Sequence, residues 1–158
     1  MTVIRLESVD ATHAFGERLG RLLRAGDVLV LTGGLGAGKT TLTQGIAAGL
    51  GVRGPITSPT FVIARTHPSL VGGPELVHVD AYRLSGAIEL DDLDLDASVS
   101  DAVTVVEWGA GLAEELADEH LEVVLEAGGD GDGGSDGRTV RLLPTGKRFE
   151  RLAAELAG

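Results

Sequence analysis

Apolar residues in this sequence gather in short runs that are separated by stretches of helical spacing. Residues 27–32 are nearly all apolar, and such a run is typical of a strand buried on both faces of a parallel sheet. Residues 75–80 indicate the next strand, and residues 102–107 indicate another buried strand. The last two of these runs each end on a carboxylate. Shorter runs, which predict further strands, lie at residues 3–6, 61–64, 121–125 and 139–143.

The stretches between the runs predict helices. In the first stretch an apolar stripe extends from Phe15 to Leu23, and we expect Asp10 or Thr12 to cap the start of this helix and Gly26 to follow its end. Residues 85–101 indicate short helical turns. Further helices are expected to begin near Lys39, to carry Leu112 and Leu116, and to close the chain with Phe149, Leu152, Ala153 and Leu156.

This alternation of strands and helices favours one fold class. It predicts a three-layer α/β/α fold with a mostly parallel central sheet. No internal repeat and no second domain is visible, so we expect residues 1–158 to form a single domain. Within it, residues 128–137 are too rich in Gly and Asp for regular structure, and we interpret them as a flexible hairpin loop.

The net charge and the cysteine count exclude several classes of function. A net charge of −11 repels a phosphate backbone, so we expect no direct nucleic-acid binding by the chain alone. The absence of Cys excludes disulfides, thiolate catalysis and Cys-ligated metals. The first ten residues are acidic where a signal peptide is basic and then apolar, and no apolar run approaches the roughly 20 residues that span a bilayer. We therefore expect a cytoplasmic protein without a membrane segment.

A glycine-rich segment at residues 33–40 matches the pattern G-x-x-x-x-G-K-[ST] between a buried strand and an amphipathic helix. Glycines let the backbone N–H groups wrap a phosphate, while Lys39 reaches its outer oxygens and Thr40 offers a hydroxyl to Mg²⁺. The alternative is a plain Gly-rich turn. The motif predicts that ATP or ADP with Mg²⁺ binds to Gly34, Leu35, Gly36, Ala37, Gly38, Lys39, Thr40 and Thr41.

Three further residues are candidates for catalysis. Asp80 and Glu107 end neighbouring runs, and ligands bind at the carboxyl ends of strands in open α/β sheets. Asp80 would hold Mg²⁺ or its water shell, and Glu107 would bind the ion or orient the attacking water; alternatively both are solvated strand ends. Thr60 lies where small GTPases place a switch threonine, although Pro59 also fits a simple stiffened connection.

The identity of the base rests on weaker signals. The chain lacks an Asn-Lys-x-Asp stretch of the kind that reads guanine, so ATP is the default nucleotide. Thr12 is a candidate contact to the nucleotide, with helix capping as the alternative. His78, two residues before Asp80, is expected to pack in the core or to support a neighbouring ligand.

Taken in order, these segments resemble the TsaE (YjeE) family, the ATPases of bacterial threonylcarbamoyladenosine (t6A) synthesis in tRNA. Their order and spacing are more specific than the glycine-rich motif alone. The matching segments are Gly36-Ala37-Gly38-Lys39-Thr40-Thr41, Ser58-Pro59-Thr60-Phe61, His78-Val79-Asp80-Ala81-Tyr82-Arg83-Leu84 and Val106-Glu107-Trp108.

The resemblance implies a P-loop NTPase fold without a separate lid domain, in which Thr40 and Glu107 touch Mg²⁺ and Asp80 lies close by. It implies weak ATPase activity that rises in complex with the partners TsaB and TsaD, TsaD itself being the transferase. This chain departs from the family at Gly34, where Asp is usual, and at Gly109, where Pro or an acid often follows the Glu-Trp pair. A small-molecule kinase and a non-hydrolysing nucleotide-binding module remain the alternatives.

Overall fold

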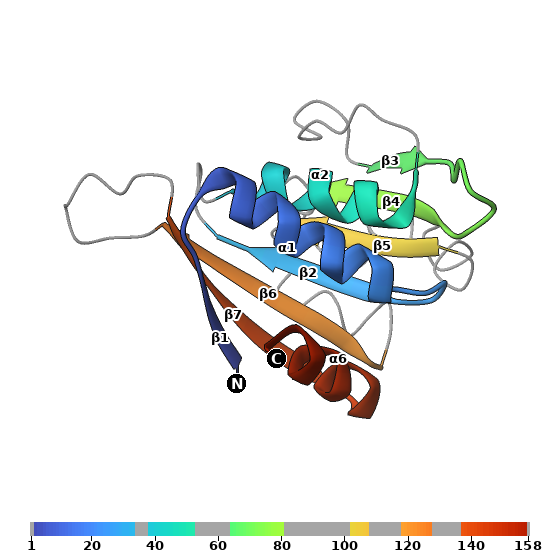
Figure 1. The fold of residues 1–158 in the computed structure, drawn as a ribbon. Coiled ribbons are helices and arrows are strands. Elements are labelled where there is room, and N and C mark those ends of the chain that lie inside the picture. Colours follow the sequence, from blue (N-terminus) through green and yellow to red (C-terminus); the bar gives the residue numbers. More distant parts are fainter. Residues whose placement is uncertain are drawn as a thin grey trace.

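A computed structural model describes residues 2–33, 38–52, 64–80, 102–107, 118–127 and 137–157. The described segments form one sheet and three helices, connected along the chain as Figure 1 shows. In chain order they are β1 (Thr2–Leu6), α1 (Val9–Leu22), β2 (Val28–Thr32), α2 (Lys39–Leu50), β3 (Ala64–His67), β4 (Glu75–Asp80), β5 (Ala102–Glu107), β6 (His120–Ala127), β7 (Arg138–Thr145) and α6 (Lys147–Ala157).

The strands form a mixed sheet of seven strands in the order β1-β7-β6-β2-β5-β4-β3. The central strands β6, β2, β5 and β4 run parallel to one another, which agrees with the predicted mostly parallel central sheet. The pairs β1–β7, β6–β7 and β3–β4 are antiparallel, so the sheet is mostly parallel only in its middle. In this order β2 lies between β6 and β5, and the glycine-rich segment therefore leaves the sheet near its centre.

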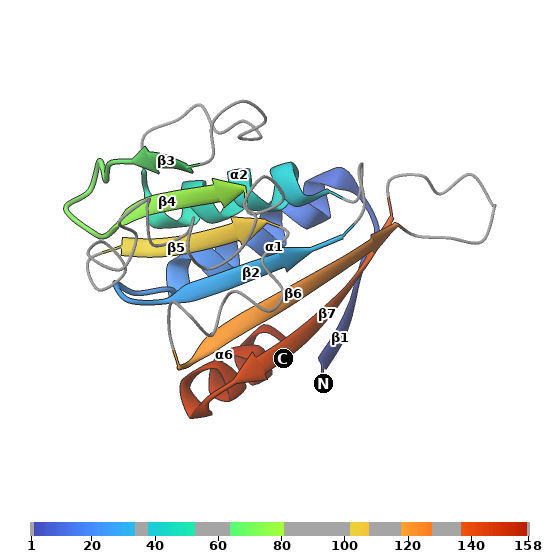
Figure 2. The ribbon, with the colours of Figure 1, turned by 180° about the vertical axis from the view of Figure 1, so that it is seen from behind.

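The helices α1, α2 and α6 all cover the same face of the sheet, as the two opposite views show (Figures 1 and 2). Their apolar side chains form one core with the inward residues of the strands, including Phe15, Leu29 and Phe149. Val79 and Val106 are buried on the opposite face as well. The second helical layer of the predicted three-layer fold falls on residues outside the described segments.

Helices α1 and α2 pack backbone against backbone. A Cβ added to Gly16 would lie 2.5 Å from the Leu42 carbonyl oxygen and 3.0 Å from the Gly45 Cα. A Cβ on Gly45 would overlap the carbonyl oxygen of His13. Gly20 and Gly49 repeat this arrangement one turn further along the same pair of helices. The glycines thus hold the helix that follows the glycine-rich segment directly against α1.

The ends of two elements differ from the expected ones. Ser8, rather than Asp10 or Thr12, caps α1, because its hydroxyl oxygen accepts a hydrogen bond from the Ala11 N–H at 3.0 Å. The helix ends at Leu22, and Gly26 lies four residues further on, in the turn before β2.

Strand β3 is described at Ala64–His67, whereas we predicted residues 61–64. The predicted short turns at 85–101 and the helix with Leu112 and Leu116 lie outside the described residues, as do residues 128–136 of the Gly/Asp-rich loop. Among the helices that the structure describes, none combines the length and the apolar character needed to cross a membrane.

Candidate functional site

The described ends of the glycine-rich segment fit a phosphate-binding turn. Strand β2 ends at Thr32, and Gly38 precedes α2 with a φ of 101°, in the left-handed region that favours glycine. Helix α2 then begins at Lys39, so its first N–H groups point toward the carboxyl edge of the sheet. Residues 34–37, which carry most of the predicted phosphate contacts, lie outside the described part.

Lys39 lies beneath this turn with its ammonium group buried. Its Nζ donates a hydrogen bond to the Gly33 carbonyl oxygen at 2.9 Å and lies 3.9 Å from Oε1 of Glu107. The side chain therefore bridges the two ends of the glycine-rich segment and faces a carboxylate on the neighbouring strand. An ammonium and a carboxylate that share one buried edge are a suitable pair for binding a metal-bound polyphosphate.

Glu107 is fixed in this position by the sheet and by His78. It ends β5, where its Cα pairs with Leu31 on one side and with Asp80 on the other. Oε2 of Glu107 lies 2.5 Å from Nε2 of His78, and both side chains are almost entirely buried. His78 therefore supports the side chain of Glu107, which was one of the two roles that the sequence suggested for it. The hydrogen bond leaves the other carboxylate oxygen of Glu107 facing Lys39.

The remaining predicted site residues are placed only in part. The backbone of Asp80 ends β4 directly beside Glu107, while its side chain and Thr60 lie outside the described set. Thr40 and Thr41 occupy the first turn of α2 and are half-buried. Thr12 is buried in α1, where its hydroxyl donates to the Ser8 carbonyl oxygen at 3.3 Å. The roles of these residues in binding or catalysis stay predictions.

The described donors fit the chemistry of Mg²⁺ and a nucleoside polyphosphate. Glu107 and Thr40 offer hard oxygen ligands, and Lys39 offers a cation beside them. Mg²⁺ usually takes one or two protein oxygens and completes its shell with phosphate oxygens and water. The buried carboxylate of Glu107 lies 3.9 Å from the Lys39 ammonium, beyond hydrogen-bond distance. Its Oε1 can therefore still accept a cation.

Sequence reasoning missed two residues at this edge. Arg138 begins β7, and a Cβ added to Gly38 would lie 3.4 Å from its Nε, so a second cation stands beside the glycine-rich turn. Glu122 of β6 accepts a hydrogen bond from the Thr32 hydroxyl at 2.7 Å, which ties down the strand end just before that turn. Glu122 carried only the signal of lying on a predicted strand, and Arg138 carried no signal, because the two residues meet the turn only through the strand order β7-β6-β2.

Comparison with known proteins decides the family. A sequence model described as "Threonylcarbamoyl adenosine biosynthesis protein TsaE" matches residues 6–134. The chain belongs to the TsaE family. This confirms the resemblance drawn from the motifs, and it agrees with the α/β fold of the described segments.

Relatives in this family are similar over most of their length. A protein of Streptomyces coelicolor named tRNA threonylcarbamoyladenosine biosynthesis protein TsaE is 58% identical over 135 residues, which cover 85% of this chain and 90% of the relative. A protein of the same name from Bacillus subtilis is 37% identical over 154 residues, covering 97% and 92%. The crystal structure of Bacillus subtilis YdiB superimposes with a TM-score of 0.76 at 33% identity, covering 99% of this chain and 93% of that one.

Proposed function

We propose that this chain is a weak, Mg²⁺-dependent ATPase that supports the t6A modification of tRNA by acting on a complex of TsaB and TsaD in the cytoplasm. The observation that carries the proposal is the meeting of Lys39 and Glu107, 3.9 Å apart, at the carboxyl edge of the sheet beside the glycine-rich turn. Membership of the TsaE family and the printed names of the relatives support the pathway.

In this proposal, Lys39 and the N–H groups of the turn bind the β- and γ-phosphates. Lys39 would exchange its hydrogen bond to the Gly33 carbonyl for phosphate oxygens, which costs little because the ammonium keeps three donors. The first turn of α2 adds its unpaired N–H groups and the positive end of the helix dipole. Arg138 adds a further positive charge beside Gly38.

Thr40, Glu107 and Asp80 are the residues that would hold Mg²⁺ or its water shell. The bound ion would neutralise charge that develops on the transferring phosphoryl group. Glu107 presents Oε1 to that space while His78 holds Oε2, so its geometry is set before nucleotide binds. Glu107 thus either ligates the ion directly or accepts a hydrogen bond from the attacking water. Thr60 would report the presence of the γ-phosphate, as switch threonines do.

In an accessory protein, the bound nucleotide would control the interaction with the partner proteins. An ATPase that is slow alone and faster on its partners couples hydrolysis to their cycle, and the site proposed here needs no acceptor substrate. The net charge of −11 favours a protein partner over direct contact with tRNA. TsaB and TsaD are the partners that the family resemblance implies.

The test measures ATP turnover by the full chain alone and with purified TsaB and TsaD, with and without Mg²⁺. We expect slow turnover alone, stimulation by the pair, and loss of both nucleotide binding and turnover in Lys39→Ala. Arg21→Ala is the matched control, because it removes an exposed cation of α1. Normal hydrolysis by Lys39→Ala would show that the site is wrong. Lack of stimulation by the pair would show that the partners are wrong.

A further inference from the structure

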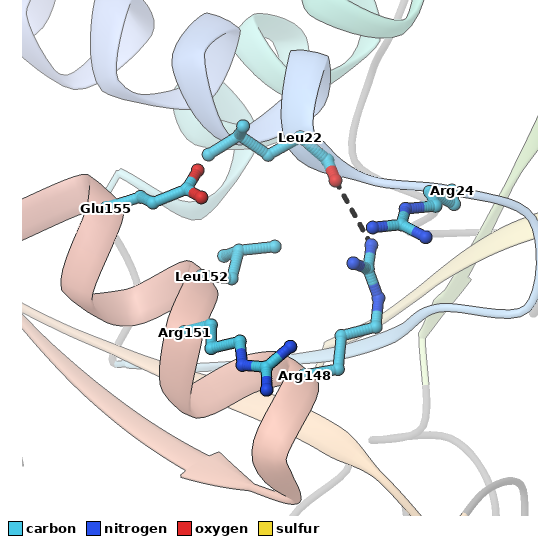
Figure 3. Close-up of a pocket in the computed structure, with 6 residues that line it drawn as sticks. All are labelled: Leu22, Arg24, Arg148, Arg151, Leu152 and Glu155. Carbon is cyan, nitrogen blue, oxygen red and sulfur yellow. Dashed lines mark hydrogen bonds between the residues drawn. The ribbon is translucent and has the colours of Figure 1, made fainter.

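A hollow lies at the end of the sheet opposite to the glycine-rich turn. It has a volume of about 430 Å³ and is lined by Leu22, Arg24, Arg148, Arg151, Leu152 and Glu155 (Figure 3). Its walls are the last turn of α1, the segment that leads into β2, and one side of α6. Because β2 runs from this end toward the glycine-rich turn, a group bound here cannot touch a nucleotide held there.

The two helices that form this hollow are tied together near both ends of α6. Near its start, Arg148 donates through Nε to Asp27 at 2.8 Å and through a terminal nitrogen to the Leu22 carbonyl oxygen at 3.1 Å. Near its end, Arg18 of α1 donates to the Leu156 carbonyl oxygen at 3.2 Å. The hollow is therefore held open by fixed contacts and does not need to form when a ligand arrives.

The charge of Arg148 is already balanced within the protein. Asp27 receives two hydrogen bonds from its guanidinium group and is buried, and this carboxylate raises the pKa of Arg148. Asp27 also accepts the backbone N–H of Arg24 at 2.7 Å, which fixes the turn that carries Arg24. Arg148 and Asp27 thus form a rigid, neutral base for the hollow.

Within the described segments, the charges of Arg24 and Arg151 are not paired with a carboxylate in this way. Both side chains are exposed, and neither forms an ion pair with any residue that the structure describes. In the view of Figure 3 the guanidinium group of Arg24 lies next to that of Arg148, whereas that of Arg151 points toward the aliphatic part of the Arg148 side chain, and the Glu155 carboxylate lies on the far side beside Leu22. The three guanidinium groups line one hollow, where like charges repel each other, and an anion bound among them relieves that repulsion.

We propose that this hollow binds a phosphate group, either free or carried by a small molecule. A guanidinium group matches two phosphate oxygens at once, and two unbalanced guanidinium groups suit a dianion. Leu22 and Leu152 add an apolar wall on which a small organic group can pack. An RNA strand would need a longer row of cations on a chain whose net charge is −11.

The test titrates the full chain with inorganic phosphate and with glycerol phosphate, all in a Lys39→Ala background so that the glycine-rich turn does not contribute. Binding is followed by calorimetry and by the Nε–H signals of the arginines in ¹H–¹⁵N spectra. The test variant is Arg24→Gln with Arg151→Gln, which keeps the contact between Arg148 and Asp27. The control is Arg5→Gln with Arg21→Gln, which removes the same charge from exposed ion pairs elsewhere.

We expect saturable binding that shifts the signals of Arg24 and Arg151, that falls about tenfold or more in the test variant, and that stays within about twofold in the control. Thermal unfolding of both variants checks that each remains folded. Equal binding by the test variant and the control would overturn the proposal, and so would the absence of saturable binding at millimolar phosphate.

Two further probes test whether the hollow binds a macromolecule instead of a phosphate group. A glutamate-rich peptide and a short single-stranded RNA are titrated against the same variants. If only the peptide or only the RNA depends on Arg24 and Arg151, the hollow is a contact for a macromolecule and the proposed phosphate site is rejected. Tighter binding of glycerol phosphate than of inorganic phosphate would support a phosphorylated small molecule, and equal binding would support free phosphate.

Discussion

The imidazole of His78 and the carboxylate of Glu107 meet at 2.5 Å on adjacent parallel strands, with both side chains almost entirely buried. The contact is diagonal, because the Cα of His78 pairs with Val105 and that of Glu107 pairs with Asp80. It fixes one oxygen of Glu107 and leaves the other directed at Lys39. Three residues on three elements thereby acquire a defined mutual geometry.

His78→Leu tests whether this contact orients Glu107. We expect ATP turnover to fall about tenfold or more while the KM for ATP changes little, because the carboxylate stays present but is no longer held. His78→Gln, which retains a donor, should recover part of the rate. The measurement is kcat and KM for phosphate release in the presence of TsaB and TsaD. Equal losses in the Leu and Gln variants would argue for packing alone.

Glu107→Gln separates binding from hydrolysis. Removing the charge while keeping the shape should lower turnover about 10²-fold or more, whereas the affinity for ADP without Mg²⁺ should remain within a few-fold of the original. Calorimetry of nucleotide binding and a phosphate-release assay report the two quantities. Glu126→Gln, on the exposed part of β6, is the control for loss of one carboxylate. Unchanged turnover in Glu107→Gln would remove Glu107 from the proposed site.

Gly45→Ala tests the contact between α1 and α2. Alanine favours a helix by about 1 kcal/mol over glycine, so the change would stabilise an isolated α2. Here the new Cβ would overlap the His13 carbonyl oxygen, and we expect a net loss of about 1–3 kcal/mol in the free energy of unfolding. Gly73→Ala is the control, since the nearest atom to its Cβ would be Ser69 Oγ at 3.8 Å. Denaturant unfolding of both variants measures the difference.

Arg148→Gln tests the link between α6 and the turn before β2. The change leaves the buried Asp27 carboxylate without its guanidinium partner and should cost about 2 kcal/mol in unfolding free energy. Because the pKa of Arg148 is raised on folding, its stabilising effect is complete below the ordinary arginine pKa and is lost only in strongly alkaline solution. Arg21→Gln, from an exposed pair with Glu17, should change stability by less than about 0.5 kcal/mol.

Much of the fold follows from local pattern. The runs at 27–32, 75–80 and 102–107 became central parallel strands, and each buries apolar residues on both faces of the sheet. Helix α6 was predictable because Phe149, Leu152 and Leu156 recur at helical spacing, and all three are buried. The cap at Ser8 was missed because Ser8, Asp10 and Thr12 lie at alternate positions and each can serve, and only the backbone geometry chooses among them.

The candidate site was predictable residue by residue but not as an arrangement. Lys39 and Glu107 each carried a sequence signal, whereas their 3.9 Å separation depends on β5 lying beside β2. Arg138 carried none, because its approach to Gly38 requires the return of β7 along β6. The bridge from Arg148 to Asp27 spans 121 positions of sequence, and no local pattern could join its ends.

The absence of side chains between α1 and α2 at Gly16, Gly20, Gly45 and Gly49 limits how the molecule can transmit a signal. Main-chain atoms that already touch resist sliding or rotation past one another, so we expect the two helices to move as one body. A piston-like shift of α2 against α1 is therefore disfavoured over these turns. If ATP binds as proposed, we expect side chains at the carboxyl edge of the sheet to sense its γ-phosphate, and we expect a partner to contact the protein at this edge.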